Sequence, residues 1–135
     1  SFSRGVFVSL VTPLNRVLGL GSAKDGIEHW WAQRLSAIAL TMLGLWLVFA
    51  FIGLADLRYD TVVNWLQAPS SSILMILTLL TLGYHSQLGV QIVIEDYVHA
   101  SGLKVSALIL TTFVHFGIVV AGVFAVLKVA LGATG

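Results

Sequence analysis

A single histidine interrupts a long apolar run, and an acid–aromatic pair follows where that run ends. His85 is the only residue between positions 72 and 94 whose charge changes near neutral pH, and Asp96-Tyr97 comes shortly after it. An ionisable side chain inside a membrane segment is costly and by default marks a functional site. In a helix turning about 100° per residue, the step from His85 to Asp96 makes about three turns. We therefore expect the two side chains to share a helix face, about 16 Å apart.

Small residues flank this histidine on the same predicted face. Thr81 and Gly89 lie one turn before and one turn after His85. Such neighbours leave room for a flat group against the backbone, and imidazole is a common axial ligand of haem iron. The spacing predicts a haem pocket bordered by Thr81 and Gly89, with His85 as the ligand. A pocket that reaches from a buried histidine to an Asp-Tyr pair indicates an electron-transfer site.

The composition is that of an integral membrane protein. Of 135 residues, 58% are hydrophobic and only 10% are charged, whereas a soluble domain carries about 25% charged residues. The chain has no cysteine, which excludes disulfides, iron–sulfur ligation and thiol nucleophiles. Its formal net charge of +1 argues against a nucleic-acid partner.

Three apolar runs are long enough to cross a bilayer. A span needs about 20 apolar residues, and it must be helical because lipid cannot satisfy an open backbone. We expect an all-α membrane protein in which residues 1–135 form one membrane-anchor domain. The predicted transmembrane helices cover residues 35–54, 72–94 and 105–127, after a cytoplasmic or interfacial segment at residues 1–31.

Shorter elements are expected between these spans. Residues 61–66 predict a surface helix, and the serines at 70–72 predict hydroxyl caps for the second span after a break at Pro69. Ser101-Gly102 predicts a turn before the third span. Tryptophans at the ends of spans, which usually anchor at the headgroup level, are Trp30, Trp31 and Trp65.

Basic residues gather ahead of the first span. They are Arg4, Arg16, Lys24 and Arg34. The positive-inside rule then places the N-terminus in the cytoplasm, together with the loop that holds Asp96 and Tyr97. The first 26 residues lack a continuous apolar core before a cleavage site, so no cleaved signal peptide is expected. The absence of a basic, serine-rich presequence favours a bacterial plasma membrane over a mitochondrial inner membrane.

Three further histidines leave alternatives open. His115 lies in the middle of the third run and is chemically as good a ligand as His85. We interpret it as an interhelical hydrogen bond or a lining residue, but a self-contained cytochrome using His85 and His115 is an alternative. His99 could contact a haem propionate or take up protons, and His29 is interpreted as an interface residue.

Three motifs resemble one family of membrane proteins, the small hydrophobic membrane-anchor subunits of succinate dehydrogenase, respiratory complex II. The resemblance covers roughly residues 12–132. Its most specific feature is His85 followed by Asp96-Tyr97-Val98-His99 at the family's spacing. The other two are Pro13 to Arg16 followed by Gly19 to Lys24, and His29 to Arg34 followed by Ser36-Ala37.

The resemblance implies a role for each matched position. His85 would be one axial ligand of a b-type haem, and a histidine of a partner anchor protein would be the other. Tyr97 would hydrogen-bond a carbonyl oxygen of ubiquinone, while Asp96 would orient that corner of the site and help to supply protons. Arg34 would lie near the haem propionates and the quinone pocket, where a guanidinium suits buried anions.

The implied protein is one subunit of an oxidoreductase and is not catalytic alone. It would pair around the haem with a second three-helix anchor, which is the cytochrome b-type anchor subunit of the complex. It would attach an iron–sulfur subunit and a flavoprotein subunit to the membrane, in the citric acid cycle and the respiratory chain. A cofactor-free structural anchor is a second alternative.

Overall fold

The computed structural model describes residues 22–132 and, from residue 26 onward, their side chains. The chain forms two units, one ending at Arg34 and the other beginning at Leu35. The motif that runs from Pro13 to Lys24 falls largely outside the described residues. So do Arg4 and Arg16, on which the predicted orientation depends.

All the regular secondary structure of the described chain is helical, as predicted. Four helices follow one another, and no strand occurs between residues 22 and 132. They are α2 (Ser22–Ile52), α3 (Tyr59–Gln67), α4 (Pro69–Tyr97) and α5 (Ser101–Ala130). Three of them are long and apolar enough to cross a membrane, over Gly26–Ile52, Pro69–Tyr97 and Ser101–Ala130. The helices α4 and α5 extend past both ends of the apolar runs that predict them, whereas α2 begins well before its run and ends at Ile52, short of the predicted end at residue 54.

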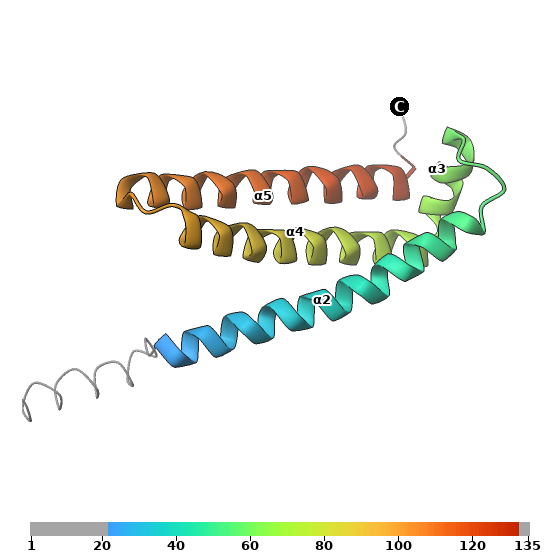
Figure 1. Ribbon diagram of the computed structural model, residues 1–135. Helices are drawn as coiled ribbons and strands as arrows, with labels where there is room; N and C mark the ends of the chain where they lie inside the picture. The colour runs from blue at the N-terminus through green and yellow to red at the C-terminus, as the bar shows by residue number, and fades with distance from the viewer. Residues whose placement is uncertain (1–21, 133–135) are drawn as a thin grey trace, which may run out of the picture. The chain divides into compact units, whose positions relative to one another are not determined.

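The helices α4 and α5 are antiparallel neighbours joined by the short connection at residues 98–100 (Figure 1). Two large–small pairs fit them together. Val119 fills the space in front of Gly83, and Leu79 lies in front of Gly122. In lipid, where apolar burial gives little driving force, such close packing is a main source of helix association.

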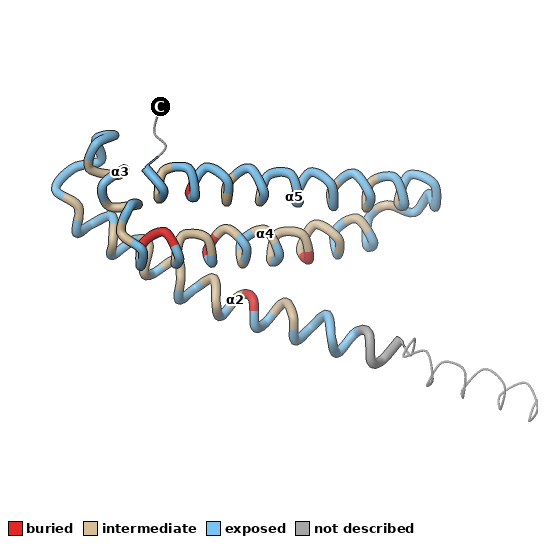
Figure 2. Tube along the Cα trace, turned by 180° about the vertical axis from the view of Figure 1, so that it is seen from behind, coloured by how far each residue is buried: buried red, intermediate tan, exposed pale blue. Residues whose placement is uncertain are grey.

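Very little of the chain is buried within itself. Among the residues whose burial is described, the buried apolar side chains are Leu88 and Val126. Figure 2 shows these and the buried serines and threonine as short stretches on helices that are otherwise exposed or half-buried. An apolar surface of this extent requires lipid or partner subunits to cover it.

The short helix α3 confirms that residues 61–66 are helical, as predicted. It contacts both α4 and α5. Trp65, which the sequence marks as an interfacial anchor, has its ring stacked on Trp46 at 5.8 Å and edge-on to Phe51 at 5.4 Å. These aromatic contacts fix α3 against the end of α2.

Two predictions about helix starts are wrong. The N-cap of α4 is Ala68, with Pro69 in the first turn, and no side chain caps it. Proline suits that turn because its missing N–H would have no partner there. Ser72 lies inside the helix and donates to the Pro69 carbonyl at 3.1 Å. Ser101 and Gly102 are the first residues of α5, not a turn before it.

The loop before α3 is held by Asp56. Its carboxylate accepts a hydrogen bond from the Thr61 hydroxyl at 2.6 Å and one from the Arg58 N–H at 3.0 Å. These two donors, the hydroxyl first, hold the pKa of Asp56 below its ordinary value of 3.8. Since the charged form is favoured, the carboxylate stabilises this loop at neutral pH.

This stabilisation is expected to disappear only in acid. Because the folded pKa is the lower one, the contribution is full above pH 3.8 and is lost as the pH falls through the depressed pKa. The check is a carboxyl ¹³C titration of Asp56 in a detergent micelle. The Thr61→Ala variant should titrate closer to 3.8, whereas an unchanged titration would contradict the hydrogen bond.

Candidate functional site

His85 lies on α4 and contacts the second unit's part of α2. Its Nδ1 atom is 2.9 Å from the hydroxyl oxygen of Ser36. Ser36 is only 7% exposed, and it is the one buried residue among positions 26–52 of α2. No described side chain hydrogen-bonds the other ring nitrogen, Nε2. One nitrogen of His85 is therefore engaged within the chain and the other is available to a ligand.

The next residue of α4 faces a different helix. The Ser86 hydroxyl lies 2.9 Å from Nε2 of His115 on α5, and Gln87 donates to the Thr112 hydroxyl at 2.9 Å. Successive residues differ by about 100° around a helix axis. The backbone of α4 thus presents His85 to α2 and Ser86 to α5. The predicted interhelical hydrogen bond at His115 is confirmed.

Both ring nitrogens of His115 are occupied. Its Nδ1 atom is 2.8 Å from the Thr111 carbonyl oxygen and 3.2 Å from the Thr111 hydroxyl. A carbonyl only accepts, so Nδ1 carries the proton, and in the neutral ring Nε2 accepts from Ser86. A metal at His115 would have to displace the Ser86 hydroxyl, whereas a metal at Nε2 of His85 would displace no hydrogen bond of the described residues.

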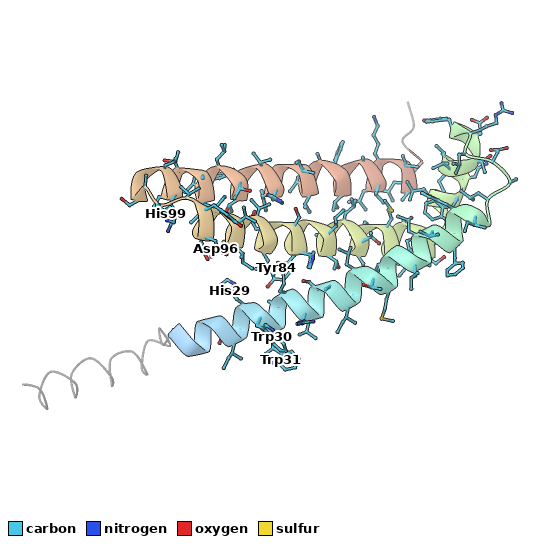
Figure 3. The ribbon with its side chains drawn as sticks, in the orientation of Figure 1. His29, Trp30, Trp31, Tyr84, Asp96 and His99 are labelled. Carbon is cyan, nitrogen blue, oxygen red and sulfur yellow. The ribbon has the colours of Figure 1, made fainter. Side chains whose placement is uncertain are left out.

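The acid–aromatic pair occupies the last turn of α4. The helix is unbroken from His85 to Tyr97, as the shared face of His85 and Asp96 requires. Asp96 is exposed and Tyr97 is 78% exposed. Figure 3 shows Asp96 at this end of α4 and His99 beside it on the connection to α5. Both polar groups of the pair are accessible from outside the chain.

The other residues predicted for the pocket lie where the helix spacing puts them. Thr81 and Gly89 are half-buried residues of α4, one turn on either side of His85. Within residues 26–132, no three His, Asp or Glu side chains gather as a metal cluster. An axial haem ligand needs no cluster, since one histidine from a chain is enough.

The described part of the first unit contains a cluster of aromatic and cationic side chains shortly before the predicted first span. Arg34 is exposed, and its guanidinium lies 5.2 Å from the centre of the Trp30 ring, a cation–π contact. Trp30 and Trp31 are edge-to-face at 5.0 Å, and His29 beside them is exposed (Figure 3). Exposed tryptophans with an arginine are typical of a membrane boundary. The role of Arg34 toward haem propionates stays a prediction.

Sequence reasoning gave no role to Ser36. It is 49 residues from His85 along the chain, and serine is a common residue of spans. No local pattern pairs the two residues, because the contact depends on how two helices are rotated against each other. The available signals were that Ser36 is a hydroxyl residue at the start of a largely apolar run and that Ser36-Ala37 belongs to the motif that follows Arg34.

Comparisons with known proteins agree on one family. Residues 9–126 match the model of the succinate dehydrogenase/fumarate reductase transmembrane subunits. The chain is similar to the succinate dehydrogenase hydrophobic membrane anchor subunit of Rickettsia bellii, with 33% identity over 78% of this chain and 85% of the relative. It is also similar to that of Paracoccus denitrificans, with 28% identity over 91% and 95% of the two chains. The succinate dehydrogenase membrane anchor subunit of Reclinomonas americana is 33% identical over 64% and 75%. The chain therefore belongs to the succinate dehydrogenase/fumarate reductase transmembrane subunits, and within them to the hydrophobic membrane-anchor subunits of succinate dehydrogenase.

Proposed function

We propose that this membrane anchor would hold the iron of a b-type haem through His85 and would form part of the site where ubiquinone is reduced. The observation that carries the haem assignment is the state of the His85 ring. Nδ1 is bonded to Ser36, and Nε2 hydrogen-bonds no described side chain. A histidine that ligates a metal through one nitrogen generally has its other nitrogen hydrogen-bonded within the protein.

The residues present fit a haem at this place. His85 would hold the iron through Nε2. The small, half-buried residues Thr81 and Gly89 leave room for a flat group against the adjoining face of α4. Such a haem would supply reversible one-electron transfer. A histidine of the partner anchor would also bind the iron, as the family resemblance implies.

The geometry argues against a haem held between His85 and His115. The two histidines belong to different helix contacts, His85 with Ser36 and His115 with Ser86. Because Nδ1 of His115 donates to a backbone carbonyl, only Nε2 could bind iron, and it is already hydrogen-bonded. The self-contained cytochrome would therefore require the contact of His115 with Ser86 to be broken.

The quinone role belongs to the exposed end of α4. Reducing a quinone takes two electrons and two protons, and the protons need donors at the aqueous edge of the bilayer. The Tyr97 hydroxyl is free to donate to a quinone oxygen, and the neighbouring Asp96 carboxylate can orient it and receive protons from water. The exposure of both side chains supports this role.

Membrane attachment follows from the exposed apolar surface of the helices. The anchor is part of an oxidoreductase complex, and we assign its partners as the cytochrome b-type anchor, the iron–sulfur subunit and the flavoprotein. Its large exposed apolar surface suits lipid and a second helical anchor. Similar anchors in Rickettsia and Paracoccus favour a bacterial plasma membrane.

A reduced-minus-oxidised spectrum of the complex, purified through this chain, tests the proposal. Wild type and His115→Ala should both show a low-spin b-type band of equal intensity. A band lost in His115→Ala would favour the self-contained cytochrome. A wild-type complex with all its subunits and no haem would leave only the cofactor-free anchor.

Replacing Tyr97 with phenylalanine is expected to slow quinone reduction about tenfold, which corresponds to roughly one lost hydrogen bond of 1.4 kcal/mol. The measurement is succinate-dependent ubiquinone reduction. Transfer of electrons to a soluble dye, which bypasses the quinone, should not change. The matched control is Tyr84→Phe, also an exposed tyrosine of α4. Equal rates for Tyr97→Phe and wild type would remove Tyr97 from the site.

A further inference from the structure

We propose that Ser36 is a positioning residue for the iron ligand, with its hydroxyl accepting the Nδ1–H of His85. This inference rests on the proposed haem function of His85. The contact is 2.9 Å long and joins residues 49 positions apart on two helices. Both residues belong to the second unit, which begins at Leu35.

The chemistry of ligation sets the direction of this hydrogen bond. An imidazole that binds a metal through Nε2 must keep its proton on Nδ1. Nδ1 is then a donor, and the Ser36 oxygen is the acceptor. The bond selects the tautomer in which Nε2 is unprotonated, and it fixes the rotation of the ring about its bond to the chain.

Burial makes the contact persistent. The Ser36 residue is 7% exposed, so water does not readily replace its hydroxyl as the partner of His85. Hydrogen bonds are also electrostatically stronger in such a low-dielectric place than in water. The helix α4 presents nothing else to this nitrogen, since Ser86 points to His115.

The expected consequence is a shift of the haem redox potential. An acceptor on Nδ1 makes the imidazole a better electron donor to the metal, which favours ferric over ferrous iron. Replacing Ser36 by alanine should weaken the preference for ferric iron about tenfold, which is the lower end of the effect of losing a hydrogen-bond partner of a metal ligand. For a one-electron couple this raises the midpoint potential by about 59 mV.

The test is a spectroelectrochemical titration of the purified complex with four variants. Ser36→Ala and Ser36→Val lack the hydroxyl, and both should keep the b-type band and raise the potential. Ser36→Thr has the shape of valine but retains the hydroxyl, so its potential should stay near wild type. Ser86→Ala is the matched control, since it removes a hydroxyl from the other histidine, and it should leave the potential unchanged.

The comparison of the Ser36→Thr potential with the Ser36→Val potential decides the proposal even if the Ser36→Ala complex does not assemble. Equal potentials in Ser36→Thr and Ser36→Val would overturn it, because the hydroxyl would then have no effect on the iron. Equal potentials in wild type and Ser36→Ala would also overturn it. Failure of the haem assignment itself looks different, since the b-type band would then be absent from wild type or unaffected by loss of His85.

Discussion

Replacing His85 with alanine is expected to remove the low-spin b-type band from the complex. Alanine offers no donor to iron, and the neighbouring α4 residues on the same face, Thr81 and Gly89, cannot replace an imidazole. Loss of a hydrogen-bond partner of a metal ligand lowers affinity by up to about 100-fold. Loss of the ligand itself should therefore lower the haem affinity by more than this. The measurement is the reduced-minus-oxidised spectrum, normalised to the flavin content of the same preparation.

Two other histidines serve as matched controls for this prediction. His99→Ala removes an exposed histidine of the α4–α5 connection, and His115→Ala removes an interhelical contact worth about 0.6 kcal/mol. Both should retain the band, although His115→Ala should melt at a slightly lower temperature. An undiminished band in His85→Ala would show that iron is held by another residue, and it would end the proposal for Ser36 as well.

The sequence predicted the spans well because bilayer thickness fixes their length. An apolar run of about 20 residues without charge has one structure available to it in lipid. Uniform helix geometry also made the common face of His85 and Asp96 predictable, since α4 has no break between them. The helix at residues 61–66 was predictable because it is a short amphipathic stretch between two breaks.

The lateral contacts could not be predicted, and they include the one at the site. Exposed hydrophobic residues are distributed along α2, α4 and α5, and Figure 2 shows that these helices are mostly exposed or half-buried in the described chain. In a soluble protein a polar stripe would reveal which side faces inward. Here no such stripe exists, so the meeting of Ser36 with His85, and that of Ser86 with His115, emerged only from the folded chain.

The helix starts were mispredicted because propensity rules do not include the connection. Serines often cap helices, but the link between α3 and α4 is a single extended residue, Ala68. The helix must then begin at Pro69, one turn before the last of the serines. The same shortness of the 98–100 connection makes Ser101 and Gly102 helical.

Introducing valine at Gly83 is expected to separate α4 from α5 and destabilise the anchor. A Cβ atom at this position would collide with a methyl group of Val119, which is branched close to its own backbone and cannot turn away. Overpacking of this kind costs about 3 kcal/mol at its upper end. The complex should dissociate at a lower temperature, measured as the midpoint of thermal loss of quinone reductase activity.

The inverse exchange should restore the fit, and this distinguishes packing from any other effect of the mutation. In Gly83→Val/Val119→Gly the large and small partners change places across the same contact, so most of the lost stability should return. Gly117→Val is the matched control, since nothing lies within 4 Å of a Cβ placed at that glycine. If the double variant is as unstable as Gly83→Val alone, the α4–α5 contact is not what the glycine protects. If it recovers, the close approach of α4 and α5, across which Ser86 meets His115, depends on a small residue facing a large one at this contact.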